Sequence, residues 1–299
     1  MEDMQLLRYI REAMLNCKVV HVGDHCQLAP VKETKPPVFN QGLPMYVLTE
    51  PMRNSGQPAL IDVCQQLRDT VETGKFNPIQ IVPGVIDLLD DDQMMAELPA
   101  VFTDPNANAR ILAYSNARVL QYNDFIRHDV RQLPADFVKG EHLVNNSTFV
   151  QGKTQISVEE EVTVISVSPD VEHYVLEPNV ELAYRRCAVS SGFAVLPEVM
   201  IPVDHGHYAK LVKYYAKQKD WQKYFFLKNT FPDFRQRDAC TVHKSQGSTY
   251  QTVCSDLENL STCTQSETGA RLMYVAFSRA STRVALYGNL TPRFGGLQL

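Results

Sequence analysis

Apolar residues recur at helical spacing in three stretches of the first 140 residues. Residues 2–16 carry leucine, isoleucine and methionine at this spacing and predict a helix. A second stripe predicts a helix from Pro58 to Gly74, because proline suits the first helical turn and glycine the residue after the last. A third stripe follows Ser115-Asn116, which are residue types that cap helices, and runs to Leu133.

Short apolar runs between these stretches predict strands of a parallel sheet. They cover residues 18–23, 109–114, 240–242 and 283–287. A further helix is expected through residues 271–279, and a short one near 91–98. Strands that alternate with helices are typical of an α/β fold. The acidic segment 83–108, rich in proline and asparagine, indicates a domain boundary.

From residue 138 to about 202 the pattern changes to short β-rich runs separated by turn residues. Such a pattern predicts a small β-barrel inserted into a different domain. We therefore expect one domain at residues 1–100 and a second built from residues 101–137 and 238–299. The insert would take residues 138–237 and include a basic, aromatic helical segment.

The composition is that of a soluble globular protein, since 44% of the 299 residues are hydrophobic and 21% are charged. No apolar run approaches the roughly 20 residues of a membrane helix, and no signal peptide is recognisable, so we expect a cytoplasmic protein without a membrane partner. The seven cysteines are odd in number and form no C-x-x-C pair. Reduced core thiols are expected rather than disulfides or a zinc site.

The net charge of −5 argues against a protein that coats nucleic acid nonspecifically. Residues 207–237, however, contain eight lysines or arginines, two aspartates and nine aromatic residues. One interpretation is a groove that tracks a nucleic-acid backbone and stacks the bases of a single strand. The other is an amphipathic helix with an aromatic core face and a solvated lysine face, and the sequence leaves both open.

Two early motifs suit contacts to a nucleotide. Gly23-Asp24 follows an apolar run and precedes Gln27, and residues just beyond parallel strands point at ligands. A glutamine there can contact a terminal phosphate or position the attacking water. The alternative interpretation is a surface turn without a ligand. Arg53, in the segment at residues 48–55 (LTEPMRNS), is either a solvated ion-pair partner or a guanidinium that contacts a γ-phosphate.

Two later motifs are more specific. Residues 241–249, TVHKSQGST, combine hydroxyl side chains with a glycine turn, and at a strand–helix junction they would suit phosphates of DNA or of a nucleotide. A loop that merely caps a helix is the alternative. Residues 272–280, LMYVAFSRA, leave Arg279 at a helix end. An arginine finger there accelerates phosphoryl transfer by about 10³ to 10⁵ on a nucleotide held by other groups.

Taken in order, these four motifs and Ala113-Tyr114-Ser115-Asn116 resemble superfamily 1 DNA helicases, most closely the RecD/Dda type of bacteria and phages. The resemblance implies an α/β fold with RecA-like parallel-sheet lobes, the first incomplete, and an inserted small β-barrel. It also implies ATP between the lobes, single-stranded DNA across them, 5′-to-3′ movement and duplex unwinding. DNA replication, repair or recombination would be the setting.

The resemblance assigns roles to individual residues. The catalytic contacts to the γ-phosphate would come from Gln27, Arg53 and Arg279. The remainder of the nucleotide cleft would be lined by Gly23, Asp24, Gln246 and Gly247. The DNA contacts would come from Tyr114, Asn116, Thr241, His243 and Lys244. The implied cofactors are ATP and Mg²⁺.

The sequence lacks the helicase phosphate loop G-x-x-x-x-G-K-[ST]. Residues 151–154, QGKT, imitate its end, but Ser147 stands where the first glycine belongs and a strand pattern follows. No Asp-Glu pair precedes Gly23, so the chain is expected to begin just after the metal-binding carboxylates and to hold no metal ligand itself. Its partners would be single-stranded DNA and a complementary N-terminal helicase fragment.

Three functional hypotheses follow. The first is the C-terminal part of an ATP-dependent DNA helicase, inactive without its N-terminal part or working as a split subunit. The second is a non-catalytic module that binds single-stranded DNA, and the third is a decayed remnant. On the first hypothesis the isolated chain has no DNA-stimulated ATPase, and its first 100 residues are poorly stable because the run at residues 19–22 is a bare strand edge.

Overall fold

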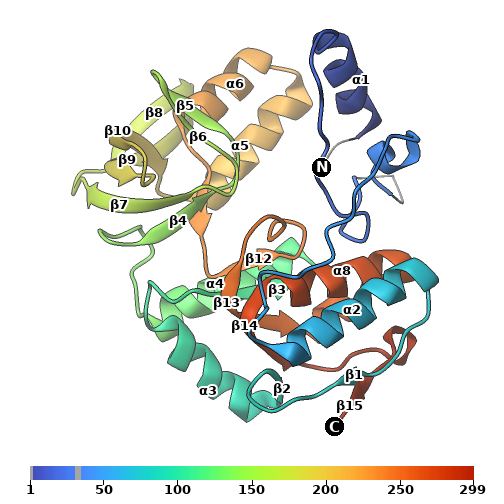
Figure 1. Ribbon diagram of the computed structural model, residues 1–299. Helices are drawn as coiled ribbons and strands as arrows, with labels where there is room; N and C mark the ends of the chain where they lie inside the picture. The colour runs from blue at the N-terminus through green and yellow to red at the C-terminus, as the bar shows by residue number, and fades with distance from the viewer. Residues whose placement is uncertain (1–2, 31–34) are drawn as a thin grey trace. The chain divides into compact units, whose positions relative to one another are not determined.

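The computed structural model describes residues 3–30 and 35–299 and divides the chain into two compact units (Figure 1). Unit 1 takes residues 1–101, 107–122 and 239–299. Unit 2 takes residues 102–106 and 123–238. No helix in the described ranges is both long and apolar enough to span a membrane.

Unit 1 is built on a five-stranded parallel sheet with the strand order β12-β3-β13-β14-β2. The strands are β2 (Ile86–Leu89), β3 (Ala109–Ala113), β12 (Ala239–Thr241), β13 (Tyr250–Asp256) and β14 (Ala280–Tyr287). A separate parallel pair joins β1 (Ile79–Gln80) to β15 (Leu297–Gln298). The parallel sheet confirms the α/β class, and the predicted strands at 109–114, 240–242 and 283–287 are present.

Two helices, α2 and α8, lie side by side in unit 1 (Figure 1) and enclose its core. Leu60, Val63 and Leu67 of α2 share one hydrophobic cluster with Leu272 and Val275 of α8. The helical segments are α1 (Met4–Ala13), η1 (Pro37–Asn40), α2 (Pro58–Thr73), α3 (Asp91–Phe102), α4 (Asn116–Phe125), α7 (Leu257–Ser261), α8 (Ser266–Ser278) and η3 (Pro292–Phe294).

The ends of α2 follow from its sequence. Pro58 occupies the first turn, where its missing N–H costs no hydrogen bond. Gly74 ends the helix in the left-handed conformation, with φ of 72°, and its N–H donates to the Thr70 carbonyl. The predicted helix from Pro58 to Gly74 is therefore confirmed.

The predicted strand at residues 18–23 is wrong. These residues follow α1 as irregular chain, and Val20 and Val22 are exposed. A strand needs a neighbour to pair with its backbone. Among the described residues no strand pairs with this run, and the sheet of unit 1 ends at β12 and β2. The apolar pattern therefore forms no sheet in this structure.

Unit 2 contains an antiparallel sheet with the order β10-β9-β7-β4-β11, to which β8 adds by pairing with β9. The strands of this sheet are β4 (His142–Asn145), β7 (Glu161–Val167), β8 (Glu172–Glu177), β9 (Val180–Ser190), β10 (Val195–Pro202) and β11 (Phe234–Gln236). A separate antiparallel pair joins β5 (Phe149–Gln151) to β6 (Thr154–Ile156). A π-helical turn, η2 (Ile126–Val130), extends α4 into this unit. The predicted β-rich insert is present as this curled antiparallel sheet.

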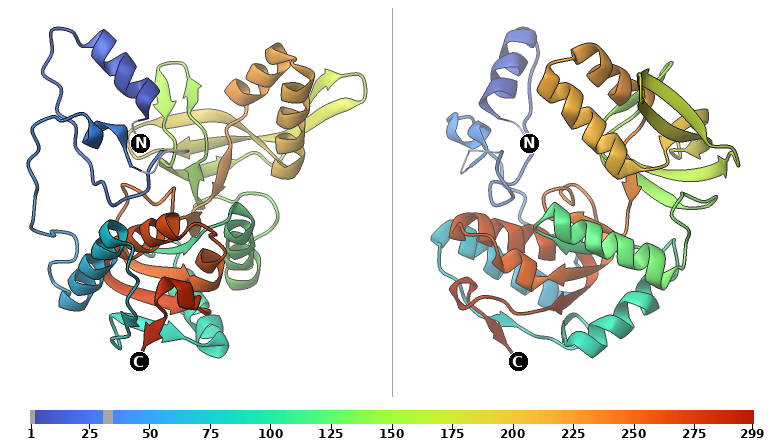
Figure 2. Two further views of the ribbon diagram at one scale, coloured as in Figure 1. Left: turned by 90° about the vertical axis from the view of Figure 1, so that its right-hand side faces the viewer. Right: turned by 180° about the vertical axis from the view of Figure 1, so that it is seen from behind.

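Helices α5 (His205–Gln218) and α6 (Trp221–Thr230) form a hairpin beside the sheet of unit 2 (Figures 1 and 2). Residues 151–154 form the turn between β5 and β6, where Gly152 has φ of 61°. A strand, β6, follows this turn instead of a helix. The sequence QGKT is therefore a hairpin turn and not a phosphate loop.

Candidate functional site

Arg279 and Arg53 meet at the amino edge of the sheet in unit 1. Arg279 follows the last residue of α8 and precedes β14, and only 2% of its surface is exposed. Its guanidinium donates to the Val275 and Ser248 oxygens at 3.3 Å each. Arg53 comes from a turn before α2 and donates from Nε to Thr249 Oγ1 at 2.7 Å and from Nη1 to the Ser278 carbonyl at 2.6 Å.

Among the residues that the structure describes, neither guanidinium has a partner of opposite charge. Burial, together with the positive charge of Arg53, lowers the pKa of Arg279 to about 10. Across residues 3–30 and 35–299, no carboxylate lies within ion-pair distance of either arginine. Neutral oxygens accept their hydrogen bonds, but no described residue balances their charge. A bound anion with several oxygens would supply that balance.

The loop at residues 242–249 connects the two edges of the sheet. Thr241 pairs with Ala113 at the carboxyl end of β3, whereas Thr252 pairs with Ala109. The loop therefore returns about 13 Å along the sheet, at roughly 3.3 Å per residue of β3. It ends by presenting the Ser248 carbonyl and the Thr249 hydroxyl to the two arginines.

The expected strand–helix junction at this motif is wrong, because β13 follows the loop directly. The turn closes through its own polar groups, and the buried Ser245 hydroxyl donates to the Val242 carbonyl at 2.8 Å. Gly247 has φ of 90°, which a side chain disfavours. Gln246 is half-buried and Gly247 exposed. Both lie on the loop that reaches the arginines, and whether they line a nucleotide cleft stays a prediction.

The Gly23-Asp24 motif is held against helices α2 and α8. Asp24 accepts from Arg68 Nη1 at 2.9 Å and from the Tyr274 hydroxyl at 2.7 Å. Burial by itself would raise the pKa of Asp24, but hydrogen bonds from Tyr274 and the Cys26 amide and the charge of Arg68 hold it below the usual value. Asp24 is thus a charged carboxylate whose partners are protein groups.

Gln27 is positioned through its backbone. Its carbonyl and that of His25 accept from Arg271 of α8, the former at 2.8 Å. The side chain of Gln27 is half-buried, and within the described part of the chain no hydrogen bond joins it to Arg53 or Arg279. Gly23 is exposed, as expected of a residue beside a turn. The structure therefore brings the two arginines together but does not bond Gln27 to them.

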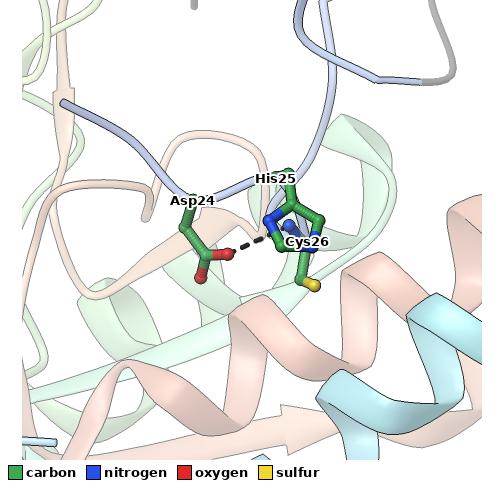
Figure 3. Close-up of side chains that lie close together, drawn as sticks. All are labelled: Asp24, His25 and Cys26. Carbon is green, nitrogen blue, oxygen red and sulfur yellow. Dashed lines mark hydrogen bonds between the residues drawn. The ribbon is translucent and has the colours of Figure 1, made fainter. Parts of the chain in front are cut away.

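Asp24, His25 and Cys26 gather ligand atoms of metal-binding type within 4.8 Å of one another (Figure 3). Figure 3 also shows the Asp24 carboxylate bonded to the Cys26 amide. His25 Nε2 lies 3.0 Å from Glu72 Oε1, and the cation beside Asp24 is Arg68. Burial raises the pKa of Cys26 to about 12, which favours the thiol over the metal-binding thiolate. These partners explain the cluster as a docking contact on α2.

The predicted DNA contacts gather at the opposite, carboxyl edge of the sheet. Tyr114 follows β3 and His243 follows β12, and their ring centroids lie 6.3 Å apart. Asn116 is exposed at the start of α4. Thr241 is buried and its hydroxyl accepts from the Lys244 amide at 3.3 Å. The structure thus brings Tyr114 and His243 together and uses Thr241 to shape the turn.

Residues that the sequence interpretation missed hold this carboxyl edge in place. Asn259 Oδ1 accepts from the amides of Tyr114 at 2.8 Å and Ser115 at 2.9 Å. Asp256 accepts from Arg118 Nε at 2.6 Å and from the Tyr122 hydroxyl at 2.7 Å. It also caps α7 through the Asn259 amide at 2.8 Å. An aspartate that ends an apolar strand, with an asparagine three residues on, was the available signal.

The segment that carries β12, the loop, α8 and Arg279 can be compared with known families. Residues 238–287 match the family model of the UvrD-like helicase C-terminal domain. This segment is similar to a helicase domain. The resemblance to superfamily 1 helicases is thereby confirmed, and it supports a helicase-related function in general. No curated protein matches the chain in sequence.

Several solved helicase structures are similar to the chain at low identity. The Pif1 helicase from Candida albicans has 14% identity and a TM-score of 0.42, over 84% of this chain and 57% of that one. The Pif1 helicase from Bacteroides, in complex with ADP-AlF3 and ssDNA, has 13% identity and a TM-score of 0.43, over 93% of this chain and 63% of that one. The chain therefore spans about three-fifths of the length of these structures.

Proposed function

We propose that the chain is part of an ATP-dependent DNA helicase, in which unit 1 contributes to both the nucleotide site and the DNA site. The pair of Arg53 and Arg279 carries this proposal, because it concentrates two positive charges with no carboxylate partner among the described residues. The match of residues 238–287 to a helicase domain supports it. Movement in the 5′-to-3′ direction belongs to the same proposal and rests on the resemblance alone.

ATP, when bound, supplies the phosphoanhydride bond whose hydrolysis drives movement along DNA. Arg279 and Arg53 contact the γ-phosphate and stabilise the negative charge that develops there. Gln27 positions the attacking water, while Gly23, Asp24, Gln246 and Gly247 complete the cleft. The phosphate loop and the Mg²⁺ ligands come from a helicase part outside these 299 residues, since the sequence contains neither motif.

At the carboxyl edge, bases of single-stranded DNA stack on Tyr114 and His243, whose rings already lie close together. Asn116, Thr241 and Lys244 contact the phosphates, and such contacts position a strand without reading its sequence. The alternative function is a non-catalytic module for single-stranded DNA, which the Tyr114–His243 pair would serve without any nucleotide.

The first test measures anion binding by the chain itself. Pyrophosphate, titrated by calorimetry, is expected to bind the wild type and to bind Arg279→Ala at least tenfold more weakly, as for loss of charge-assisted hydrogen bonds. Lys153→Ala, in the β5–β6 turn, is the matched control and should bind as the wild type does. Equal binding by all three proteins would contradict the nucleotide role of the arginines.

The second test measures DNA-stimulated ATP hydrolysis. The chain alone should show none, and mixing it with a helicase fragment that carries the phosphate loop and Asp-Glu pair should restore activity that Arg279→Ala abolishes. ATP hydrolysis by the chain alone, lost in Arg279→Ala, would contradict the need for a second part. DNA binding that is sensitive to salt, with no hydrolysis in any mixture, would favour the binding module.

A further inference from the structure

The α5–α6 hairpin of unit 2 divides its aromatic residues between a buried and an exposed set. Tyr208, Leu211 and Tyr215 of α5 and Leu227 of α6 are buried in one cluster with Tyr184 of β9. This buried set accounts for part of the basic, aromatic segment as ordinary core. It leaves the outward side chains of both helices unexplained.

The outward face of α5 is a stripe of lysines. Lys210, Lys213, Tyr214 and Lys217 recur at helical spacing and are all exposed, and Lys219 follows in the turn. Lys210 and Lys217 lie about 10 Å apart along the helix, at 1.5 Å per residue. None of the four lysines forms an ion pair with a carboxylate in the described ranges. The stripe is therefore uncompensated positive charge.

The outward face of α6 is a stripe of aromatic rings. Trp221 and Phe225, one helical turn apart, are 53% and 54% exposed, and their ring centroids are 6.5 Å apart. Tyr224 meets Trp221 at 5.7 Å, and Lys228 Nζ lies 5.7 Å from the Tyr224 ring. Leaving two large rings in water costs the free energy that their burial would release. Such a surface indicates a ligand that covers flat rings.

Charge separates this surface from an ordinary salt-bridged helix. The charge of Lys223 is balanced, since its Nζ lies 2.6 Å from Glu177 and 3.0 Å from Asp220. The lysine stripe of α5 has no such carboxylate partners among the described residues. The stripe ends at the two-residue turn that precedes Trp221, the first residue of α6. A ligand that fits both stripes carries regularly spaced negative charges and flat apolar groups.

We propose that the outward face of the α5–α6 hairpin binds single-stranded nucleic acid. Bases stack on Trp221 and Phe225, and phosphates contact Lys213, Lys217 and Lys219. This site goes beyond the proposed function, because it lies wholly in unit 2 and uses none of the helicase motifs. Through this site the chain binds single-stranded nucleic acid whether or not a nucleotide is bound.

The single tryptophan of the chain reports on this surface directly. Titration of the full chain with oligo(dT) of 15 nucleotides should quench Trp221 emission in a saturable way. Phe225→Ala should weaken binding about tenfold, as expected for one lost stacking contact. Lys213→Glu with Lys217→Glu should reduce the slope of log affinity against log salt by about 0.7 per lost phosphate contact. Circular dichroism checks that each variant is folded.

Matched controls lie in the same unit. Phe193, between β9 and β10, is 98% exposed and tests whether any exposed aromatic ring contributes to oligo(dT) binding. Phe193→Ala should bind oligo(dT) as the wild type does. Lys153→Glu, in the β5–β6 turn, tests whether any lysine suffices and should also leave the affinity unchanged. Weakening by these controls equal to that of the hairpin variants would overturn the proposal.

Further outcomes separate this site from the proposed function. Thr241→Ala with His243→Ala, in unit 1, should leave the quenching intact, and quenching should persist even if the chain neither binds pyrophosphate nor supports ATPase. Loss of quenching in that unit 1 variant would overturn an independent hairpin site. Unchanged emission at saturating DNA would overturn it too, as would a response to anionic lipid vesicles with none to oligo(dT).

Discussion

The two edges of the parallel sheet in unit 1 bury charges equally deeply but treat them differently. At the carboxyl edge Asp256 is 1% exposed and is matched by Arg118, the Tyr122 hydroxyl and a helix cap. At the amino edge Arg279 is 2% exposed, has no carboxylate partner in the described part of the chain, and experiences the like charge of Arg53. The first arrangement stabilises the fold. The second costs stability, and on the proposed function a bound anion offsets that cost.

Asp256→Ala should produce the largest change. It removes the carboxylate that pairs with Arg118, hydrogen-bonds Tyr122 and caps α7. Asp256 is buried but the Arg118 side chain is 34% exposed, so the cost comes from the hydrogen bonds lost at the carboxylate, about 3 kcal/mol of unfolding free energy in all. Urea denaturation followed by circular dichroism measures it. Asp62→Ala, at an exposed site on α2, should change stability by no more than about 0.5 kcal/mol. A similar loss in both variants would show that the carboxyl edge is not specially stabilised.

Arg279→Met tests the opposite edge. Because the guanidinium is buried without a carboxylate, an apolar side chain of similar length should leave the unfolding free energy unchanged or raise it. Pyrophosphate affinity should fall by about 2 kcal/mol, the value of a charge-assisted hydrogen bond. Thermal unfolding with and without pyrophosphate measures both quantities. A strong destabilisation by Arg279→Met in the absence of anion would erase the contrast between the edges.

Asn259→Ala should have a smaller effect at the carboxyl edge. It removes the acceptor of the Tyr114 and Ser115 amides and should cost about 1 to 2 kcal/mol. Asn259→Asp keeps an acceptor oxygen and is the matched control. On the proposed function, the alanine variant should also bind single-stranded DNA more weakly, since the Tyr114 ring loses its fixed position. Wild-type stability in the alanine variant would show that water replaces the side chain.

The sequence predicted the elements whose signals are local. Pro58 and Gly74 bound α2 because proline and glycine act within a turn of their own position. The apolar run at residues 19–22 led to a wrong prediction of a strand, because an apolar stretch forms a strand only where another strand pairs with it. The turn at Gly247 was predicted, but the strand β13 that follows it was not, because a helix was expected there. Whether a helix or a strand follows a turn depends on sheet order, which no local pattern contains.

The candidate site follows the same division. Arg53 and Arg279 were selected from their motifs. That Arg279 bonds the Ser248 carbonyl and Arg53 the neighbouring Thr249 hydroxyl is a property of the folded loop. Asp24 was also selected from its motif, but its hydrogen bonds to Arg68 and Tyr274, residues 44 and 250 positions away, were not predictable from it. Contacts at such separations are set by packing. The sequence therefore identifies candidate chemistry better than it identifies partners.

His205 in unit 2 is a buried base that, unlike Arg279, can lose its charge, and its substitution should have the smallest effect. Its two ring nitrogens are buried without a hydrogen-bond partner among the residues described, and it packs on Phe137. Burial lowers its pKa, so the imidazole stays neutral, which an arginine cannot do at neutral pH.

The unfolded state then binds more protons below about pH 6.5, so stability is complete above that pH and falls as the pH drops. His205 should contribute about 1 kcal/mol of this loss by pH 5.5. Burial also lowers the pKa of His142 and His243, so the acid loss should shrink by that amount in His205→Phe, whereas His128→Asn, at an exposed site, should keep all of it. Urea midpoints at pH 7.5 and 5.5 measure the difference, and an equal acid loss in His205→Phe and the wild type would assign it to another group.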